Sequence, residues 1–90
     1  MNFYKYLSEF LGTFTLIMVI LVTGNPIMIG ATLTLIILLT SSISGGHINP
    51  AVSFAMVSIK QMETEQFIPY IASQILGGLA AVEVYHRYKK

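Results

Sequence analysis

The order of apolar and charged residues divides the chain into long stretches that predict membrane-spanning helices. No Asp, Glu, Lys or Arg occurs in residues 10–59, and none occurs in residues 66–82. A spanning helix needs roughly 20 mostly apolar residues to cross a hydrocarbon core of about 30 Å. The turn signals between the apolar runs predict three spans, at about residues 7–23, 27–42 and 67–85.

A fourth apolar segment, within residues 44–59, is too short to cross a membrane. Its first part has the sequence SGGHINP, which breaks any helix, and residues 51–59 after it are apolar and compatible with a helix. The alternative is an amphipathic helix on the membrane surface, but residues 51–59 carry no Lys or Arg to face water or headgroups. The pattern therefore predicts a re-entrant half-helix, which survives at membrane depth only where protein or a water-filled cavity surrounds it.

The composition agrees with this fold class, an all-α membrane protein with three transmembrane helices plus one re-entrant half-helix. Hydrophobic residues make up 54% of the chain, and the net charge is only +1. The uncharged blocks argue against most enzymes, and the lack of a large basic patch argues against nucleic-acid binding. Without cysteine there are no thiolate metal ligands, and we expect no metal and no cofactor. Because Glu9 interrupts the first apolar run, we do not expect this run to be a signal peptide.

Asn49 and Pro50 form a strong start for the short helix. Asn is among the best N-cap residues, and Pro is the favoured first helical residue. A half-helix that begins here would direct its free N–H groups and its positive dipole end into the membrane interior, attracting a water oxygen and repelling a cation. If the Asn49 side-chain oxygen caps the helix, the amide nitrogen stays free to donate to a pore water. The simpler interpretation is that Asn49 only caps a buried helix.

Three segments of the chain carry a resemblance to a known family. They are SEFLGTF at residues 8–14, SGGHINPAV at residues 44–52 and PYIASQILGG at residues 69–78. In this order they resemble the first helix, the first Asn-Pro-Ala loop and the third helix of the aquaporin and glycerol-facilitator, or major intrinsic protein, family. That family has six spans and two half-helices in two inverted repeats. The resemblance implies that residues 1–90 are a single half-aquaporin repeat of a passive channel for water and small neutral solutes such as glycerol.

The resemblance also implies which residues line the pore. In the family the loop carbonyls face the pore, and an Arg after the second Asn-Pro-Ala helps to form a narrow filter. Here Val52 follows Ala51, and the matching positions of the second span are Ile29 and Ile37. An apolar filter of this kind favours water plus small neutral solutes over strict water selectivity. The expected pore residues are Ile29, Ile37, Gly45, Gly46, His47, Ile48, Asn49, Pro50, Ala51 and Val52.

Three polar side chains are expected to support the loop or the spans. Glu9 lies one turn into the first span, where an ionised carboxylate is costly and needs a partner inside the protein. By resemblance that partner is the backbone of residues 46–49. The alternative is a small proton-coupled transporter that uses Glu9, as in the small multidrug resistance family, which has four spans and no half-helix. We interpret His47 as a hydrogen-bonded structural residue rather than a pH gate or metal ligand, and Gln74 as a buried amide that bonds the loop.

Small residues on the third span predict close helix packing. In lipid, helices associate by close backbone contact, which small residues permit. Ser73, Gly77 and Ala81 repeat at i, i+4 and i+8, and Gly12 provides a matching notch on the first span. With the adjoining Gly78, these are the expected packing residues.

One half-helix is not enough for a pore of this family, so the resemblance implies a second half-repeat as partner. The predicted topology places Lys5 and Lys60 on one side of the membrane and Arg87, Lys89 and Lys90 on the other. Because Lys and Arg in short loops set orientation, this near balance permits insertion in both directions and hence an inverted homodimer. A separate second-half subunit, or truncation of a longer protein, fits the same residues. The resemblance further implies assembly into four pores, surrounded by membrane lipid.

Overall fold

The computed structural model describes residues 3–89, which form four α-helices and one short 3-10 helix and include no β-strand. Lys90, which the charge balance above includes, lies outside the described residues. The elements are α1 (Phe3–Thr23), α2 (Pro26–Thr40), α3 (Pro50–Ser58), η1 (Thr64–Gln66) and α4 (Phe67–Lys89). The described chain is therefore all-helical, as the sequence predicts.

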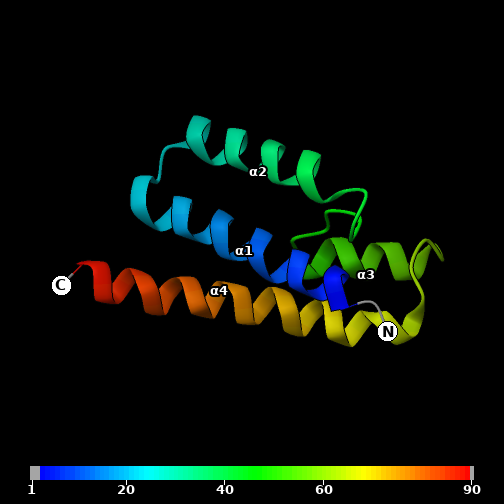
Figure 1. Ribbon diagram of the computed structural model, residues 1–90. Coiled ribbons are helices and arrows are strands. Elements are labelled where there is room, and N and C mark those ends of the chain that lie inside the picture. The colour runs from blue at the N-terminus through cyan, green and yellow to red at the C-terminus, as the bar shows by residue number, and fades with distance from the viewer. Residues whose placement is uncertain (1–2, 90) are drawn as a thin grey trace.

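α1 and α4 form the frame of the molecule. They lie side by side and run in the same direction, and α2 packs on the other side of α1 (Figure 1). Gly77 is buried where the two long helices meet, and a Cβ atom at this position would collide with the backbone carbonyl of Phe10. The absence of a side chain at Gly77 is thus what lets the two backbones approach so closely.

A tight turn joins α1 to α2. Gly24 adopts a positive φ of 62°, a conformation that glycine reaches without steric cost. The Oδ1 atom of Asn25 accepts hydrogen bonds from the N–H groups of Ile27 at 2.8 Å and Met28 at 3.1 Å, and Pro26 begins the helix. This is a complete N-cap.

The chain between α2 and α3 turns back into the molecule. α2 ends at Thr40, hydrogen-bonded turns continue to Gly45, and the backbone then runs inward to Asn49. α3 begins near the middle of the long axis and returns to the end of the molecule where α2 finished (Figure 1). Residues 41–58 therefore enter and leave the helical frame on the same side.

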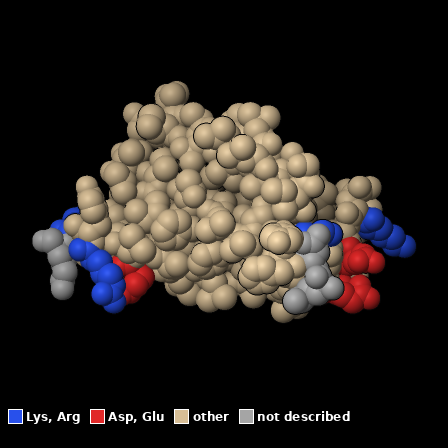
Figure 2. Space-filling view, viewed as in Figure 1, with Lys and Arg blue, Asp and Glu red and all other residues tan. Residues whose placement is uncertain are grey.

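Polar side chains occupy the interior, and apolar side chains cover much of the outside. The buried polar residues are Ser8, Glu9, Thr13, Ser44, Ser53 and Gln74. Charged side chains gather at the two ends of the molecule, and an uncharged band lies between them (Figure 2). An apolar exterior around a polar interior is suited to a lipid environment, where buried polar groups must find partners within the protein.

The helix ends differ from the predicted spans. α1 begins at Phe3 rather than residue 7, and α4 continues to Lys89 rather than residue 85, because the polar residues at these ends are compatible with a helix that extends beyond the apolar run. α1, and α4 together with η1, are long and apolar enough to cross a membrane. α2 has 15 residues, a length of about 22 Å.

Gly12 has a different partner from the expected one. A Cβ atom on Gly12 would lie 2.6 Å from Cδ1 of Ile48 and 3.0 Å from Cγ2 of Ile36. The notch in α1 therefore accommodates the loop and α2, whereas Gly77 provides the close approach to α4. Ala81 is fully buried and Ser73 is half-buried, and a Cβ atom on Gly78 would lie 3.7 Å from Cγ1 of Ile17.

Candidate functional site

Glu9 is the centre of the hydrogen bonds that hold the loop. Its side chain is fully buried. Oε1 accepts from the Ile48 N–H at 2.7 Å and from Gln74 Nε2 at 2.8 Å. Oε2 accepts from Ser44 Oγ at 2.6 Å and from the His47 N–H at 3.1 Å. Four donors fill the lone-pair sites of one carboxylate, and hydrogen bonds to an ionised acceptor are the strong ones.

With these four donors, Glu9 is suited to be a fixed hydrogen-bond acceptor rather than a site that binds and releases transported protons. The two backbone donors to Glu9 lie within residues 46–49, the segment that the sequence analysis proposes as its partner. Two side chains, Ser44 and Gln74, complete the set. No observation on the described residues favours the transporter interpretation.

Ile48 has an unusual backbone that Glu9 and Gly12 together stabilise. Its φ is +60°, a region that costs a β-branched residue of order 1–3 kcal/mol. The N–H of Ile48 donates to Glu9, and its side chain, only 4% exposed, lies in the Gly12 notch. Its carbonyl accepts a long hydrogen bond of 3.4 Å from Thr13 Oγ1. The side chain of Ile48 therefore points into the helical frame, and the pore role expected of its backbone carbonyl stays a prediction.

His47, Ser53 and Gln74 form a second set of contacts behind the loop. Gln74 Nε2 donates to Ser53 Oγ at 2.9 Å, and Ser53 Oγ lies 2.8 Å from Nδ1 of His47. Because Ser53 already accepts from Gln74, its own hydroxyl hydrogen is available for Nδ1, which favours the His47 tautomer with hydrogen on Nε2. Gln74 is thus a buried amide that bonds Glu9 and Ser53 of α3, and it reaches the loop through these two residues. Its Oε1 is buried and has no partner among the described residues.

Tyr70 is a support residue that the sequence analysis missed. Its side chain is 2% exposed, its hydroxyl donates to the Ser44 carbonyl at 2.7 Å, and its ring lies 5.1 Å from the His47 ring. The hydrogen bonds of the Ser44 and Ser53 hydroxyl groups were not predicted either. A signal exists in the sequence, because Tyr70 precedes Gln74 by four residues and so shares its helix face.

The start of α3 leaves several polar groups without partners. Asn49 is exposed, and its Oδ1 accepts from the Ala51 N–H at 2.7 Å, while Nδ2 makes no hydrogen bond within residues 3–89. The carbonyls of Gly45, Gly46 and His47 likewise accept no hydrogen bond from that part of the chain. One amide donor and three successive carbonyl acceptors can therefore bind a small polar molecule.

Apolar side chains lie near the unpartnered groups of Asn49, Gly45, Gly46 and His47, which we call the polar edge. Ile37 is 39% exposed, and its Cα lies 3.5 Å from where a Cβ on Gly46 would be. Ile29 is half-buried and lies eight residues earlier on α2, about 12 Å away along the helix. Val52 is half-buried on α3, and Pro50 and Ala51 are exposed beside Asn49.

The geometry defines a class, an all-helical membrane protein whose buried carboxylate holds an inward-turning loop. The family model described as Major intrinsic protein matches residues 1–90. The chain belongs to the major intrinsic protein family, which confirms the resemblance in its sequence, and it is an integral membrane protein.

Curated relatives share substantial identity but are much longer. Glycerol uptake facilitator protein-like 6 of Lactiplantibacillus plantarum is 40% identical over 86 residues, which cover 86% of this chain and 40% of the relative. Aquaporin-9 of Mus musculus is 42% identical over 79% of this chain and 29% of its own length. Aquaporin Z of Photorhabdus laumondii is 33% identical over 89% of this chain and 41% of its own length. The chain thus spans less than half the length of these relatives. No solved structure matches it.

Proposed function

We propose that this chain is one half of a passive channel for water and small neutral solutes such as glycerol. α1, α2 and α4 are its three spans, and residues 44–59 are its re-entrant loop and half-helix. Two kinds of relatives support the proposal by name, a glycerol uptake facilitator and aquaporins. Because α2 alone is short, we include in its span the turn residues Ser41 and Ser42, of which Ser41 still donates to the Ile37 carbonyl.

The polar edge at the start of α3 is the observation that carries the proposal. Asn49 Nδ2 and the carbonyls of Gly45, Gly46 and His47 have no partners within residues 3–89. Non-helical backbone is tolerated at membrane depth only where protein surrounds it or where it lines a water-filled cavity, and these groups have no protein partner within residues 3–89. One donor and several acceptors in a row can replace the hydrogen bonds that a water or polyol makes in bulk water.

The surroundings of this edge favour neutral solutes. The N-terminus of α3 presents the positive end of a helix dipole, which disfavours cations. Ile29, Ile37 and Val52 add no charge and no donor to the constriction we propose. Small uncharged molecules with hydroxyl groups are therefore the expected cargo.

The channel needs a second half-repeat, and we propose an inverted copy of this chain as the simplest source. Lys5 lies in the first turn of α1 and Lys60 follows the end of α3, whereas Arg87 and Lys89 lie in the last turn of α4. Basic side chains appear at both ends of the molecule, so neither end has a marked excess of them (Figure 2). This balance supports insertion in both orientations. A reporter fused to the C-terminus should be found on both sides of the membrane. A reporter on one side only would instead require a separate second-half subunit or the rest of a longer protein.

An Asn49→Ala variant tests the proposed function, with Asn25→Ala as its matched control. Both residues cap a helix through Oδ1, at a typical contribution of about 1 kcal/mol, but only Asn49 would present Nδ2 to a pore. Water and glycerol flux into proteoliposomes, followed by light scattering, should be largely lost in Asn49→Ala and retained in Asn25→Ala. Equal flux in both variants would show that Asn49 is a cap and nothing more.

A further inference from the structure

A polar pocket of about 320 Å³ lies at the end of the molecule that carries the start of α1 and the segment between α3 and α4. Its lining includes Lys5, Ser42, His47, Gln61 and Gln66, and no acidic residue is among the described residues that line it. Lys5 forms no ion pair with any other residue in the range 3–89. The pocket therefore combines a positive charge with several neutral hydrogen-bond donors.

His47 contributes a donor to this pocket. Ser53 occupies Nδ1, so Nε2 is the ring nitrogen left for another partner. Nε2 lies 3.1 Å from the position that a Cβ on Gly45 would take, and both residues line the pocket. Glu9 does not line the pocket, and its carboxylate is turned toward the four donors that surround it.

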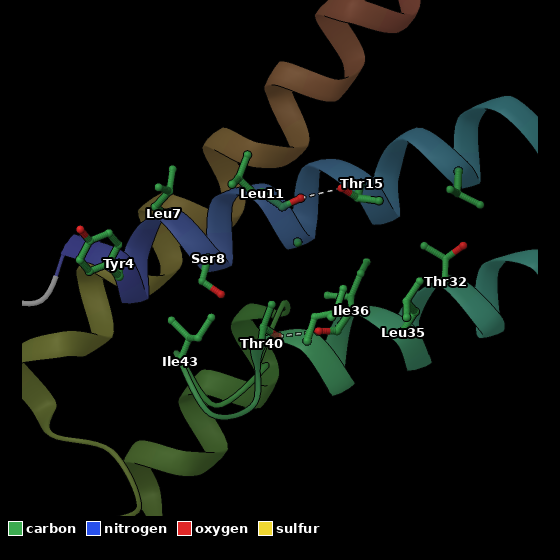
Figure 3. Close-up of a pocket in the computed structure, with 13 residues that line it drawn as sticks. Tyr4, Leu7, Ser8, Leu11, Thr15, Thr32, Leu35, Ile36, Thr40 and Ile43 are labelled. Atoms are coloured by element: carbon green, nitrogen blue, oxygen red, sulfur yellow. Dashed lines mark hydrogen bonds between the residues drawn. The ribbon is translucent and has the colours of Figure 1, made fainter.

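An apolar groove of about 550 Å³ runs between α1 and α2 (Figure 3). Leu7, Leu11 and Leu35 are among the side chains that line it. The hydroxyls of Thr15 and Thr40, which also line it, donate to carbonyls of their own helices at 2.9 and 2.8 Å. On α1 the lining extends from Tyr4 to Val19, a rise of about 22 Å, which exceeds the roughly 15 Å of hydrocarbon in one bilayer leaflet.

The pocket and the groove adjoin. Ile43 lines both, and Ser8 of the groove lies 3.3 Å, hydroxyl to hydroxyl, from Ser44 of the pocket. A cationic, donor-rich pocket that leads into an apolar groove matches the two parts of a phospholipid. We propose that this surface binds one phospholipid with an anionic headgroup, its phosphate held by Lys5 and His47 and one acyl chain lying between α1 and α2. The proposal requires the membrane environment but not solute conduction.

The headgroup site is tested by measuring how well the purified full chain in detergent retains lipid. The probes are phosphatidylglycerol and phosphatidylcholine, and the bound lipid is detected by native mass spectrometry. Phosphatidylglycerol should be retained about fivefold better, because one basic residue near anionic lipid contributes about that factor in binding. Gln66→Glu adds a negative charge inside the pocket and should remove this preference. Thr64→Glu adds the same charge on the same short helix but outside the pocket, and it should retain the preference.

A second pair of variants tests the groove. Leu35→Trp fills it, whereas Leu38→Trp places the same ring on an α2 residue that is 72% exposed and does not line it. Only Leu35→Trp should reduce retention of phosphatidylglycerol. The proposal would be overturned if both variants of either pair lost the preference for, or the retention of, phosphatidylglycerol to the same degree. It would also be overturned if excess inorganic phosphate displaced the lipid. A change of oligomeric state in Leu35→Trp without loss of lipid would assign the groove to a second copy instead. Flux is measured separately, so failure here leaves the channel proposal intact.

Discussion

Replacing Glu9 tests how strongly one carboxylate holds the re-entrant loop. Glu9→Leu removes both acceptor oxygens and leaves four donors. Ser44 and Gln74 are side chains that can reorient, whereas the backbone N–H groups of His47 and Ile48 cannot turn without moving the loop. The cost therefore falls mainly on the two backbone donors.

The magnitude follows from those contacts. A buried donor left without an acceptor costs roughly 1–3 kcal/mol, so Glu9→Leu should destabilise the native loop by about 2–6 kcal/mol. In Glu9→Gln the remaining oxygen can still accept from Ile48 and Gln74, and the new amide group can donate to the Ser44 hydroxyl. Only the His47 N–H then loses its acceptor, at a cost of about 1–3 kcal/mol together with the weaker hydrogen bonds of a neutral acceptor.

The effects of the two variants are measured by amide hydrogen exchange and by solute flux. Exchange at the His47 and Ile48 amides should accelerate strongly in Glu9→Leu, whereas in Glu9→Gln it should accelerate mainly at His47. Solute flux should fall in the same order. Equal effects of Gln and Leu on exchange would refute the hydrogen-bond reasoning. Complete loss of transport in Glu9→Gln, with wild-type transport that depends on a pH gradient, would favour the transporter interpretation.

Three further substitutions follow from individual contacts. Gly77→Ala should lower thermal stability in detergent because its Cβ collides with the Phe10 carbonyl, whereas Gly30→Ala, which meets no atom within 4 Å, should not. Tyr70→Phe leaves the Ser44 carbonyl without its donor and should cost about 1 kcal/mol in a denaturation assay, so an unchanged midpoint would contradict the role given to its hydroxyl. Val52→Arg should reduce glycerol flux more than water flux in stopped-flow measurements, since it adds bulk and donors beside the start of α3; equal losses would place Val52 away from the constriction.

The sequence alone determines the features that depend on neighbouring residues. Long uncharged runs indicate helices for a membrane because their length and composition are local properties. Asn49 and Pro50 predict where α3 begins because capping involves residues within one turn, and Oδ1 of Asn49 does accept from the Ala51 N–H. A carboxylate in an apolar run likewise demands a buried partner whatever the fold.

The tertiary structure decides which groups meet across the chain. Glu9 bonds Ile48 and Gln74 over separations of 39 and 65 residues, and no periodicity in the sequence specifies such pairs. Gly12 suits either a helix or a loop as neighbour, and only the path of the loop places Ile48 against it. Tyr70 could equally have faced lipid, because its orientation depends on how α4 rotates against α1. Asn49 and Pro50 thus specify locally where α3 begins, whereas the hydrogen bonds that support the loop depend on how α1, α3 and α4 pack around Glu9.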